Sequence, residues 1–340
     1  MESPIDIESL AGWMTGKGLG SGPIESVRAL AGGTQNIILR FTRDGRDYVL
    51  RRPPAHLRAN SAETMRREAR VLKALAGSDV PHPALIADCP DDEPLGAPFY
   101  LMEPIDGFNP LGTLPEPHAS SAAIQHGMGM ALVDGIAALG RVDYRAVGLD
   151  GFGKPDNFLE RQVQRWRSQL TGYADLAGWP GADALPAVAA IGAWLERHRP
   201  AASRPGIMHG DYHLANVMFR HDGPALAAIV DWELATIGDP LLDLGWVLAT
   251  WPEGDRESTV SVEPWIGFPS AAELVDRYRI GSDRDLSAIG WYHVLACYKL
   301  GILLEGTYAR ACAGKAPRDV GERLHGRAVT LFERADRLTR

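Results

Sequence analysis

The stretch of sequence that says most about this protein is His209-Gly-Asp-Tyr-His-Leu-Ala-Asn-Val-Met-Phe219, followed shortly by Ala227-Ala-Ile-Val-Asp-Trp-Glu233. Residues 217–219 and 227–230 are apolar runs on either side of a loop that contains glycine and proline, a pattern typical of a β-hairpin. A hairpin brings the residue before its first strand close to the residue after its second strand. The pattern therefore predicts that two polar side chains far apart in the sequence lie near each other.

The residues at the two ends of this hairpin are Asn216 and Asp231, and Asp211 lies shortly before Asn216. Phosphoryl transfer needs a carboxylate that orients the attacking hydroxyl and accepts its proton. It also needs oxygen ligands for a magnesium ion on the phosphates. Asp211, Asn216 and Asp231 supply both on one short element, so the sequence favours a phosphotransferase.

A zinc-dependent hydrolase is the strongest alternative chemistry. His209, Asp211 and His213 alternate along the chain, so on a strand all three would face one side and could bind zinc. That alternative leaves Asn216 and Glu68 without a role. A nucleotide-binding pseudokinase without turnover is a second alternative, and the complete carboxylate and amide set argues against it.

The first third of the chain has the pattern of a sheet with one helix. Residues 24–50 contain alternating apolar positions and a tight turn at Asp44-Gly45, and the apolar runs 84–87 and 99–102 continue the strand pattern. Between them, residues 61–76 have helical periodicity, and we expect Ser61 to be the N-cap.

Glu68 stands on the apolar face of that helix, three residues after Met65 and four before Leu72. A carboxylate on a buried stripe needs a cationic partner. The alternative is an exposed residue at the edge of a helix rich in arginine. We favour the buried position.

Prolines and glycines interrupt regular structure just after Glu103, and the chain beyond them is mainly helical in pattern. The helices predicted there are residues 121–139, 155–173, 185–197, 271–278, 286–308 and 320–337. The sequence thus predicts an α+β fold of two lobes. An antiparallel-sheet N-terminal lobe covers residues 1–102, a hinge covers 103–107, and a mainly helical C-terminal lobe covers 108–340.

Composition excludes several function classes. Apolar residues make up 45% of the 340-residue chain and charged residues 23%, which is ordinary for a globular protein. The net charge of −8 argues against a nucleic-acid or anionic-membrane partner, because both require a basic surface. We expect no membrane-spanning segment, since the most apolar late stretch, residues 294–304, is interrupted by Lys299.

The three cysteines, Cys89, Cys297 and Cys312, are scattered and odd in number. They are typical of reduced thiols, so we expect a cytoplasmic protein. The partner should be a small molecule that carries a hydroxyl group. The sequence is compatible with a monomer or a homodimer.

The motif HGDxxxxN, a hairpin and a following aspartate together resemble the aminoglycoside phosphotransferase and choline kinase relatives of the protein kinases. The resemblance implies a bilobal protein-kinase-like fold that uses ATP and Mg²⁺. Asp211 would be the catalytic base, and Asn216 and Asp231 the magnesium ligands. The resemblance also gives roles to three further residues: His209 would be structural, His213 would lie near the transferred phosphate, and Asp243 would brace the catalytic loop.

The resemblance extends to the nucleotide-binding half. The segment Ala31-Gly-Gly-Thr-Gln-Asn36 is similar to the loop that covers the phosphates, which implicates Gly32, Gly33, Thr34 and Asn36. Glu68 resembles the family's helix glutamate, and Arg51 stands where the family has a lysine. Met102, Glu103 and Ile105 resemble the adenine-binding hinge.

A narrower resemblance concerns the acceptor. Residues 49–54 and 161–166 are similar to the branch of this family found fused to acyl-CoA dehydrogenases, although that branch's Leu-His is Leu139-Gly140 here. The last predicted helix is rich in arginine, whereas an aminoglycoside kinase needs an acidic acceptor pocket. We therefore expect a neutral or anionic acceptor of hydroxyacyl type. An aminoglycoside or other antibiotic, or a choline-like alcohol, is the alternative.

Overall fold

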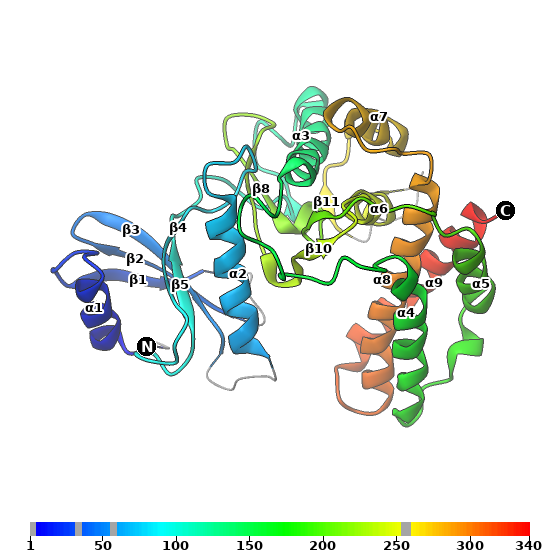
Figure 1. Ribbon diagram of the computed structural model, residues 1–340, viewed down its shortest axis with the longest axis horizontal. Coiled ribbons are helices and arrows are strands. Elements are labelled where there is room, and N and C mark those ends of the chain that lie inside the picture. The colour runs from blue at the N-terminus through cyan, green and yellow to red at the C-terminus, as the bar shows by residue number, and fades with distance from the viewer. Residues whose placement is uncertain (1–4, 31–35, 55–59, 253–259) are drawn as a thin grey trace.

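The computed structural model describes residues 5–30, 36–54, 60–252 and 260–340, which form two lobes (Figure 1). The N-terminal lobe contains a five-stranded antiparallel sheet in the order β1-β2-β3-β5-β4. Its strands are β1 (Ile24–Ala29), β2 (Ile37–Arg43), β3 (Arg46–Arg52), β4 (Leu85–Cys89) and β5 (Phe99–Met102). Asp44 and Gly45 both have positive φ, at 48° and 76°, and form the predicted tight turn between β2 and β3.

Helix α1 (Ile7–Gly16) packs on the outer part of this sheet. Its buried residues Leu10 and Met14 join Phe41, Leu50 and Phe99 in a small core separate from that of the other lobe. Figure 1 shows α2 between the sheet and the helical lobe.

Helix α2 (Ser61–Leu75) carries the predicted apolar stripe, and Glu68 on that stripe is fully buried. The expected N-cap was wrong. Ser61 is the first helical residue, and the cap is Asn60, which has a left-handed backbone and makes no side-chain capping bond. Asparagine tolerates this conformation better than serine, and that preference decides the position of the helix start.

The C-terminal lobe is helical, as the sequence predicts. Its helices are α3 (Ala122–Arg141), α4 (Glu160–Gly172), α5 (Val188–Arg197), α6 (Leu241–Thr250), α7 (Ala271–Gly281), α8 (Ile289–Cys312) and α9 (Arg318–Leu338). Helix α6 is absent from the sequence prediction because all of its residues are buried, so no polar face gives it a helical period. Helix α4 begins five residues later than expected, after a run of turns.

One helix is more apolar than the sequence analysis indicated. Among the described residues, α3 alone has the length and composition that could cross a membrane, with a mean hydropathy of 1.2 in its most apolar window. In the structure 56% of that window is buried, and its residues Leu132, Val133 and Ile136 belong to the core of the lobe. Burial within the protein accounts for its composition.

Candidate active site

Two short antiparallel strands hold the loop that carries Asp211. Strand β7 (Gly206–Met208) leads into the loop and pairs with β10 (Thr236–Gly238). Gly210 has a φ of +88°, and a Cβ atom there would lie 2.4 Å from the carbonyl oxygen of Leu234. Only glycine fits this left-handed, closely packed position, so the backbone turns sharply and presents the next residue to the cleft.

The predicted hairpin is present as β8 (Val217–Phe219) and β9 (Leu226–Ile229). The N–H of Val230 donates to the carbonyl oxygen of Asn216 at 2.9 Å, which closes the base of the hairpin. Asp231 follows with a left-handed backbone, φ 66°, before a short 3₁₀ turn. The hairpin thus brings Asn216 and Asp231 to the same place, as the sequence predicts.

The carboxylate of Asp211 is held by three donors. Trp246 Nε1 donates to Oδ1 at 2.9 Å, His213 Nε2 lies 3.3 Å from the same oxygen, and Asn216 Nδ2 donates to Oδ2 at 3.1 Å. Burial would raise the pKa of Asp211, but the hydrogen bond from His213 and nearby positive charge lower that pKa to about 2. The side chain is therefore ionised at neutral pH and fixed in orientation, and it is available to accept a proton.

The buried carboxylate of Asp243 bonds the backbone of the loop that carries Asp211. Asp243, on α6, accepts the N–H groups of His209 and Gly210 at 2.7 and 2.9 Å. Burial raises the pKa of Asp243, while these backbone donors favour its charged form. Asp243 therefore holds the backbone at the start of this loop, and its bracing role in catalysis stays a prediction.

Both ring nitrogens of His209 are used inside the protein. Nε2 donates to the carbonyl oxygen of Val230 at 2.9 Å, and Nδ1 accepts from the N–H of Asp211 at 3.4 Å. Burial lowers the pKa of His209, so the ring is neutral and structural. Within the ranges that the structure describes, no group of three His, Cys, Asp or Glu side chains is arranged to bind a metal.

The N-terminal lobe contributes a cluster of charges around Arg51 on β3. Arg51 Nε lies 3.1 Å from Glu68 Oε2, and Arg51 Nη2 lies 2.6 Å from Asp231 Oδ1. Tyr100 donates to Glu68 Oε2 at 2.9 Å. Burial raises the pKa of the Glu68 carboxyl, and the Arg51 guanidinium opposes that rise. The expected pairing of Arg51 with Glu68 is present, and its extension to Asp231 was not foreseen.

The hinge residues lie where β5 ends. Glu103 donates its N–H to the carbonyl oxygen of Ala84 at 2.9 Å, and its side chain lies 3.1 Å from Arg46. Ile105 is half-buried, and its backbone groups make no hydrogen bond with the residues that the structure describes. Asn36 directly precedes β2. Gly32, Gly33 and Thr34 lie outside the described residues.

The donor chemistry around the hairpin fits a hard cation. Asn216 uses its Nδ2 to bond Asp211, which leaves the amide oxygen Oδ1 as an acceptor, and the Asp231 carboxylate is 38% exposed in the cleft. Carboxylate and amide oxygens are ligands that Mg²⁺ and Mn²⁺ accept, whereas zinc prefers nitrogen and sulfur. Asn216 and Asp231 could hold such an ion.

A side chain that the sequence analysis did not assign to the site lies beside Asp211. Lys299, on α8, donates from Nζ to the carbonyl oxygen of Gly210 at 3.1 Å. Its Nζ is 4.2 Å from the ring centroid of Trp246 and 5.5 Å from that of Trp166. Burial lowers the pKa of Lys299 to about 8. The available signal was the interruption of an apolar helix by a single lysine.

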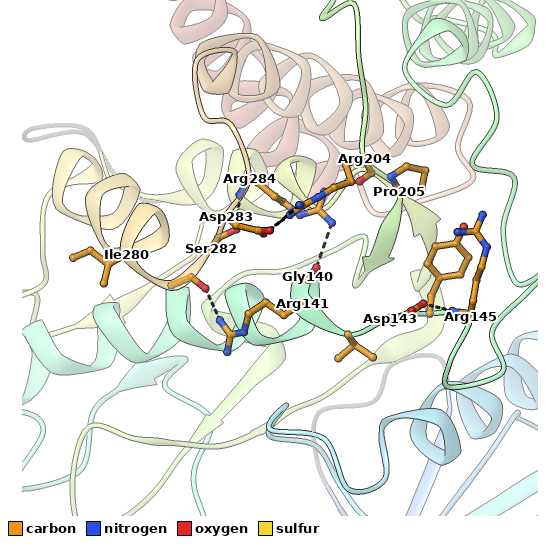
Figure 2. A pocket seen from close by; sticks show the side chains of 13 residues that line it. Gly140, Arg141, Asp143, Arg145, Arg204, Pro205, Ile280, Ser282, Asp283 and Arg284 are labelled. Carbon is orange, nitrogen blue, oxygen red and sulfur yellow. Dashed lines mark hydrogen bonds and ion pairs between the residues drawn. The ribbon is translucent and has the colours of Figure 1, made fainter.

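An open pocket of about 810 Å³ lies away from these residues, where α3, α7 and the start of β7 meet (Figure 2). Arg141 donates to the carbonyl oxygen of Gly281, and Arg284 donates to that of Gly140 at 3.2 Å. These two arginines of the pocket bond carbonyl oxygens at helix ends, a common structural role for arginine. None of the predicted site residues lines it.

Comparison with known proteins now decides the family. The model of the phosphotransferase enzyme family matches residues 26–274, which include the cluster around Arg51, the hairpin and Asp243. The chain belongs to this family. It is a small-molecule kinase, and the expected family, fold and enzyme class are confirmed.

Relatives of known structure and sequence agree with this assignment. A Ralstonia eutropha protein assigned to the aminoglycoside phosphotransferases is 30% identical and has a TM-score of 0.81. The match covers 98% of this chain and 99% of that one. A thermostable mutant of aminoglycoside phosphotransferase APH(4)-Ia, in a complex with AMP-PNP and hygromycin B, shares the fold at 14% identity. Its TM-score is 0.61, with coverage of 96% of this chain and 98% of that one.

Acyl-CoA dehydrogenase family member 10 of Mus musculus is 29% identical over 80% of this chain but only 25% of its own length. Family member 11 of Rattus norvegicus is matched over 40% of its length. The chain therefore spans well under half of these relatives, and it corresponds to one part of each.

Proposed function

We propose that this protein transfers the γ-phosphate of ATP to a hydroxyl group of a small molecule, with Asp211 as catalytic base. The observation that carries the proposal is the convergence of Asp211, Asn216, Asp231 and Arg51 at the hairpin, each held by a hydrogen bond or ion pair. Phosphoryl transfer depends on positioning and on stabilisation of charge, and this arrangement supplies both.

In the proposed reaction the acceptor oxygen attacks the γ-phosphorus and the bond between that phosphorus and the β,γ-bridging oxygen breaks. Asp211 takes the hydroxyl proton, and ADP leaves with the electron pair of the broken bond. Magnesium held by Asn216 and Asp231 would neutralise phosphate charge. His213, which donates to Asp211, would lie close to the transferred group.

The nucleotide would lie between the lobes, with adenine against Met102, Glu103 and Ile105. Among the described residues no group bonds the backbone N–H and C=O of Ile105, and an adenine edge requires such a donor and acceptor. Arg51 would contact the phosphates while Glu68 holds it in place. The AMP-PNP bound to APH(4)-Ia supports ATP as donor.

Two observations favour a neutral or anionic acceptor of hydroxyacyl type. Lys299 places a positive charge next to the base, and two relatives are named for acyl-CoA chemistry. The arginines of α9 are weaker support than the sequence indicated. Arg334 is buried and donates to the carbonyl oxygens of Leu248, Ala249 and Trp251, so it caps α6 and does not face the cleft.

An aminoglycoside acceptor is the second candidate, because the related solved structures include an enzyme with bound hygromycin B. ADP release should be measured with kanamycin and with a panel of hydroxyacyl-CoA thioesters that differ in hydroxyl position. The matched acyl-CoA without a hydroxyl group is the control. We expect turnover of at least one hydroxyacyl-CoA and none of the control; efficient turnover of kanamycin alone would assign the aminoglycoside instead.

A further inference from the structure

Lys299, which bonds the residue before Asp211, and Arg165, whose charge reaches Lys299, form no ion pair with the residues that the structure describes. Lys299 is half-buried, and its only hydrogen bond within the described residues is to the carbonyl oxygen of Gly210. Arg165, on α4, makes neither a hydrogen bond nor an ion pair with the residues that the structure describes. It lies 5.1 Å from the centroid of the Trp166 ring. A partly buried ammonium without a carboxylate is costly unless some other group compensates for it.

Both cations lie near the ring of Trp166. Trp166 is buried, and its ring has Arg165 at 5.1 Å and Lys299 at 5.5 Å from its centroid. Two positive groups on one indole repel each other, and the charge of Arg165 contributes to lowering the pKa of Lys299. Cation–π contacts offset only part of this repulsion, since each contributes about 0.5–2 kcal/mol. An anion between the two would remove it.

Trp246 links Lys299 to Asp211. Its ring lies 4.2 Å from Lys299 Nζ, and its Nε1 donates to Asp211 Oδ1 at 2.9 Å. The carboxylates whose charge reaches Lys299 are Asp243 and Asp211. Asp243 already accepts the backbone donors of the catalytic loop, and Asp211 accepts from Trp246 and Asn216. Neither carboxylate pairs directly with Lys299.

We propose that Lys299 and Arg165 form a subsite for an acidic group of the acceptor, a carboxylate or a phosphate, next to the hydroxyl that Asp211 activates. The subsite deepens the proposed function and rests on it, because it takes Asp211 to be the base. It gives a role to the otherwise unassigned Arg-Trp pair of α4. It also excludes choline-like acceptors, because the space between Trp166 and Trp246 that could hold a ligand ammonium already holds Lys299.

Binding is tested without requiring turnover. The full chain, saturated with AMP-PNP and Mg²⁺, is titrated by ligand-observed NMR with 2-, 3- and 4-hydroxybutanoate, with the corresponding amides, and with 4-aminobutan-1-ol. Glycerol 3-phosphate, which carries a phosphate and hydroxyl groups but no carboxylate, serves as the phosphate probe and separates the two kinds of acidic group. We expect saturable binding of at least one acid, and at least 10-fold weaker binding of its amide and of the amino alcohol, the loss expected when a charged partner is removed.

Variants then assign the binding to the subsite. Lys299→Met and Arg165→Met should each weaken binding of the acid at least 5-fold, whereas Lys315→Met and Arg323→Met, which remove exposed charges elsewhere, should leave it unchanged. Arg165 is exposed, so its variant remains informative should Lys299→Met fail to fold. Equal binding of acid and amide, no binding of any acid, or acid binding that survives both variants would overturn the subsite. Acid binding with no turnover of any acceptor would reject the proposed function and leave the subsite standing.

Discussion

Two cations near the candidate site, one in each lobe, have different partners. Arg51, in the N-terminal lobe, lies within 3.1 Å of Glu68 and 2.6 Å of Asp231. Lys299, in the C-terminal lobe, contacts one carbonyl oxygen and two indole rings. Nearby carboxylates raise the pKa of Arg51 against the effect of burial, whereas burial lowers the pKa of Lys299.

Arg51 forms ion pairs with carboxylates of the protein, whereas Lys299 forms none with the described residues. A buried charge is tolerable when carboxylates and hydrogen bonds compensate for its lost hydration. Arg51 meets that condition before any ligand binds. It is therefore suited to link β3 to Asp231 and, in the proposed reaction, to contact the phosphates. Lys299 does not meet that condition within the described residues, and the proposed subsite would account for its location. The following predictions test this contrast.

Metal removal should have the largest effect. Asp231 contacts Arg51 of the N-terminal lobe, and the side-chain oxygens of Asp231 and Asn216 suit Mg²⁺ or Mn²⁺. Treatment with EDTA should abolish ADP release, and Mg²⁺ or Mn²⁺ should restore it. Stoichiometric zinc in freshly purified protein, with activity lost to a zinc-selective chelator, would favour the hydrolase instead.

Replacing the base should be nearly as severe. Asp211→Asn keeps the side-chain shape and an oxygen for Trp246, but it removes the proton acceptor. We expect kcat to fall roughly 100-fold or more, with ATP affinity and the melting temperature little changed. Asp222→Asn, an exposed aspartate that pairs with Arg220 in the hairpin loop, is the matched control. Near wild-type turnover of both Asp211→Asn and Asp231→Asn would refute the assignment.

The pair in the N-terminal lobe should behave as one unit. Arg51 and Glu68 have 10% and 1% of their side-chain surfaces exposed, so removing either leaves the other charge buried and uncompensated. Arg51→Met, Glu68→Gln and the double variant should give a coupling energy of about 1–3 kcal/mol in a cycle on ATP affinity. Strict additivity would show that Arg51 acts through Asp231 alone.

Removal of Lys299 should increase the free energy of unfolding at neutral pH. The pKa of Lys299 falls from 10.5 to about 8 in the folded protein, so between those values the unfolded chain binds more protons. The wild type is therefore destabilised below pH 8 and regains stability as the pH rises towards 10.5. Lys299→Met should be more stable than wild type at pH 7 by up to ~3 kcal/mol, at ~1.4 kcal/mol per pKa unit, and the gain should shrink at pH 10.

Urea denaturation at both pH values measures this effect, with Lys315→Met as the control for an exposed lysine. Loss of the two indole contacts reduces the gain but does not reverse its dependence on pH. A variant that is less stable than wild type at pH 7 would mean that Lys299 is a structural residue.

The sequence predicted the parts of the site that are local in the chain. Asp211, Asn216 and Asp231 are linked by one hairpin, so their proximity follows from strand pairing alone. The burial of Glu68 followed from its place on the apolar stripe of α2. Arg51 was expected to pair with Glu68 and does.

The parts that the sequence did not predict depend on distant helices. Trp246 lies on α6, whose fully buried residues leave no helical period, and Lys299 lies on α8. Their contact with the catalytic loop is a product of how these two helices pack, which no local pattern records. The start of α2 was misplaced for a local reason, because a left-handed asparagine replaced the expected serine cap.

The contact between Arg51 and Asp231 also bears on how the enzyme moves. Strand β3 belongs to one lobe and Asp231 to the other, so this 2.6 Å ion pair links the two lobes. Movement of β3 away from Asp231 would break this pair, in addition to the bonds that Arg67 and Arg70 of α2 donate to carbonyl oxygens of the C-terminal lobe. In the proposed reaction a cation bound at Asp231 would compete with Arg51 for this carboxylate, which would couple arrival of the metal to movement of the lobes.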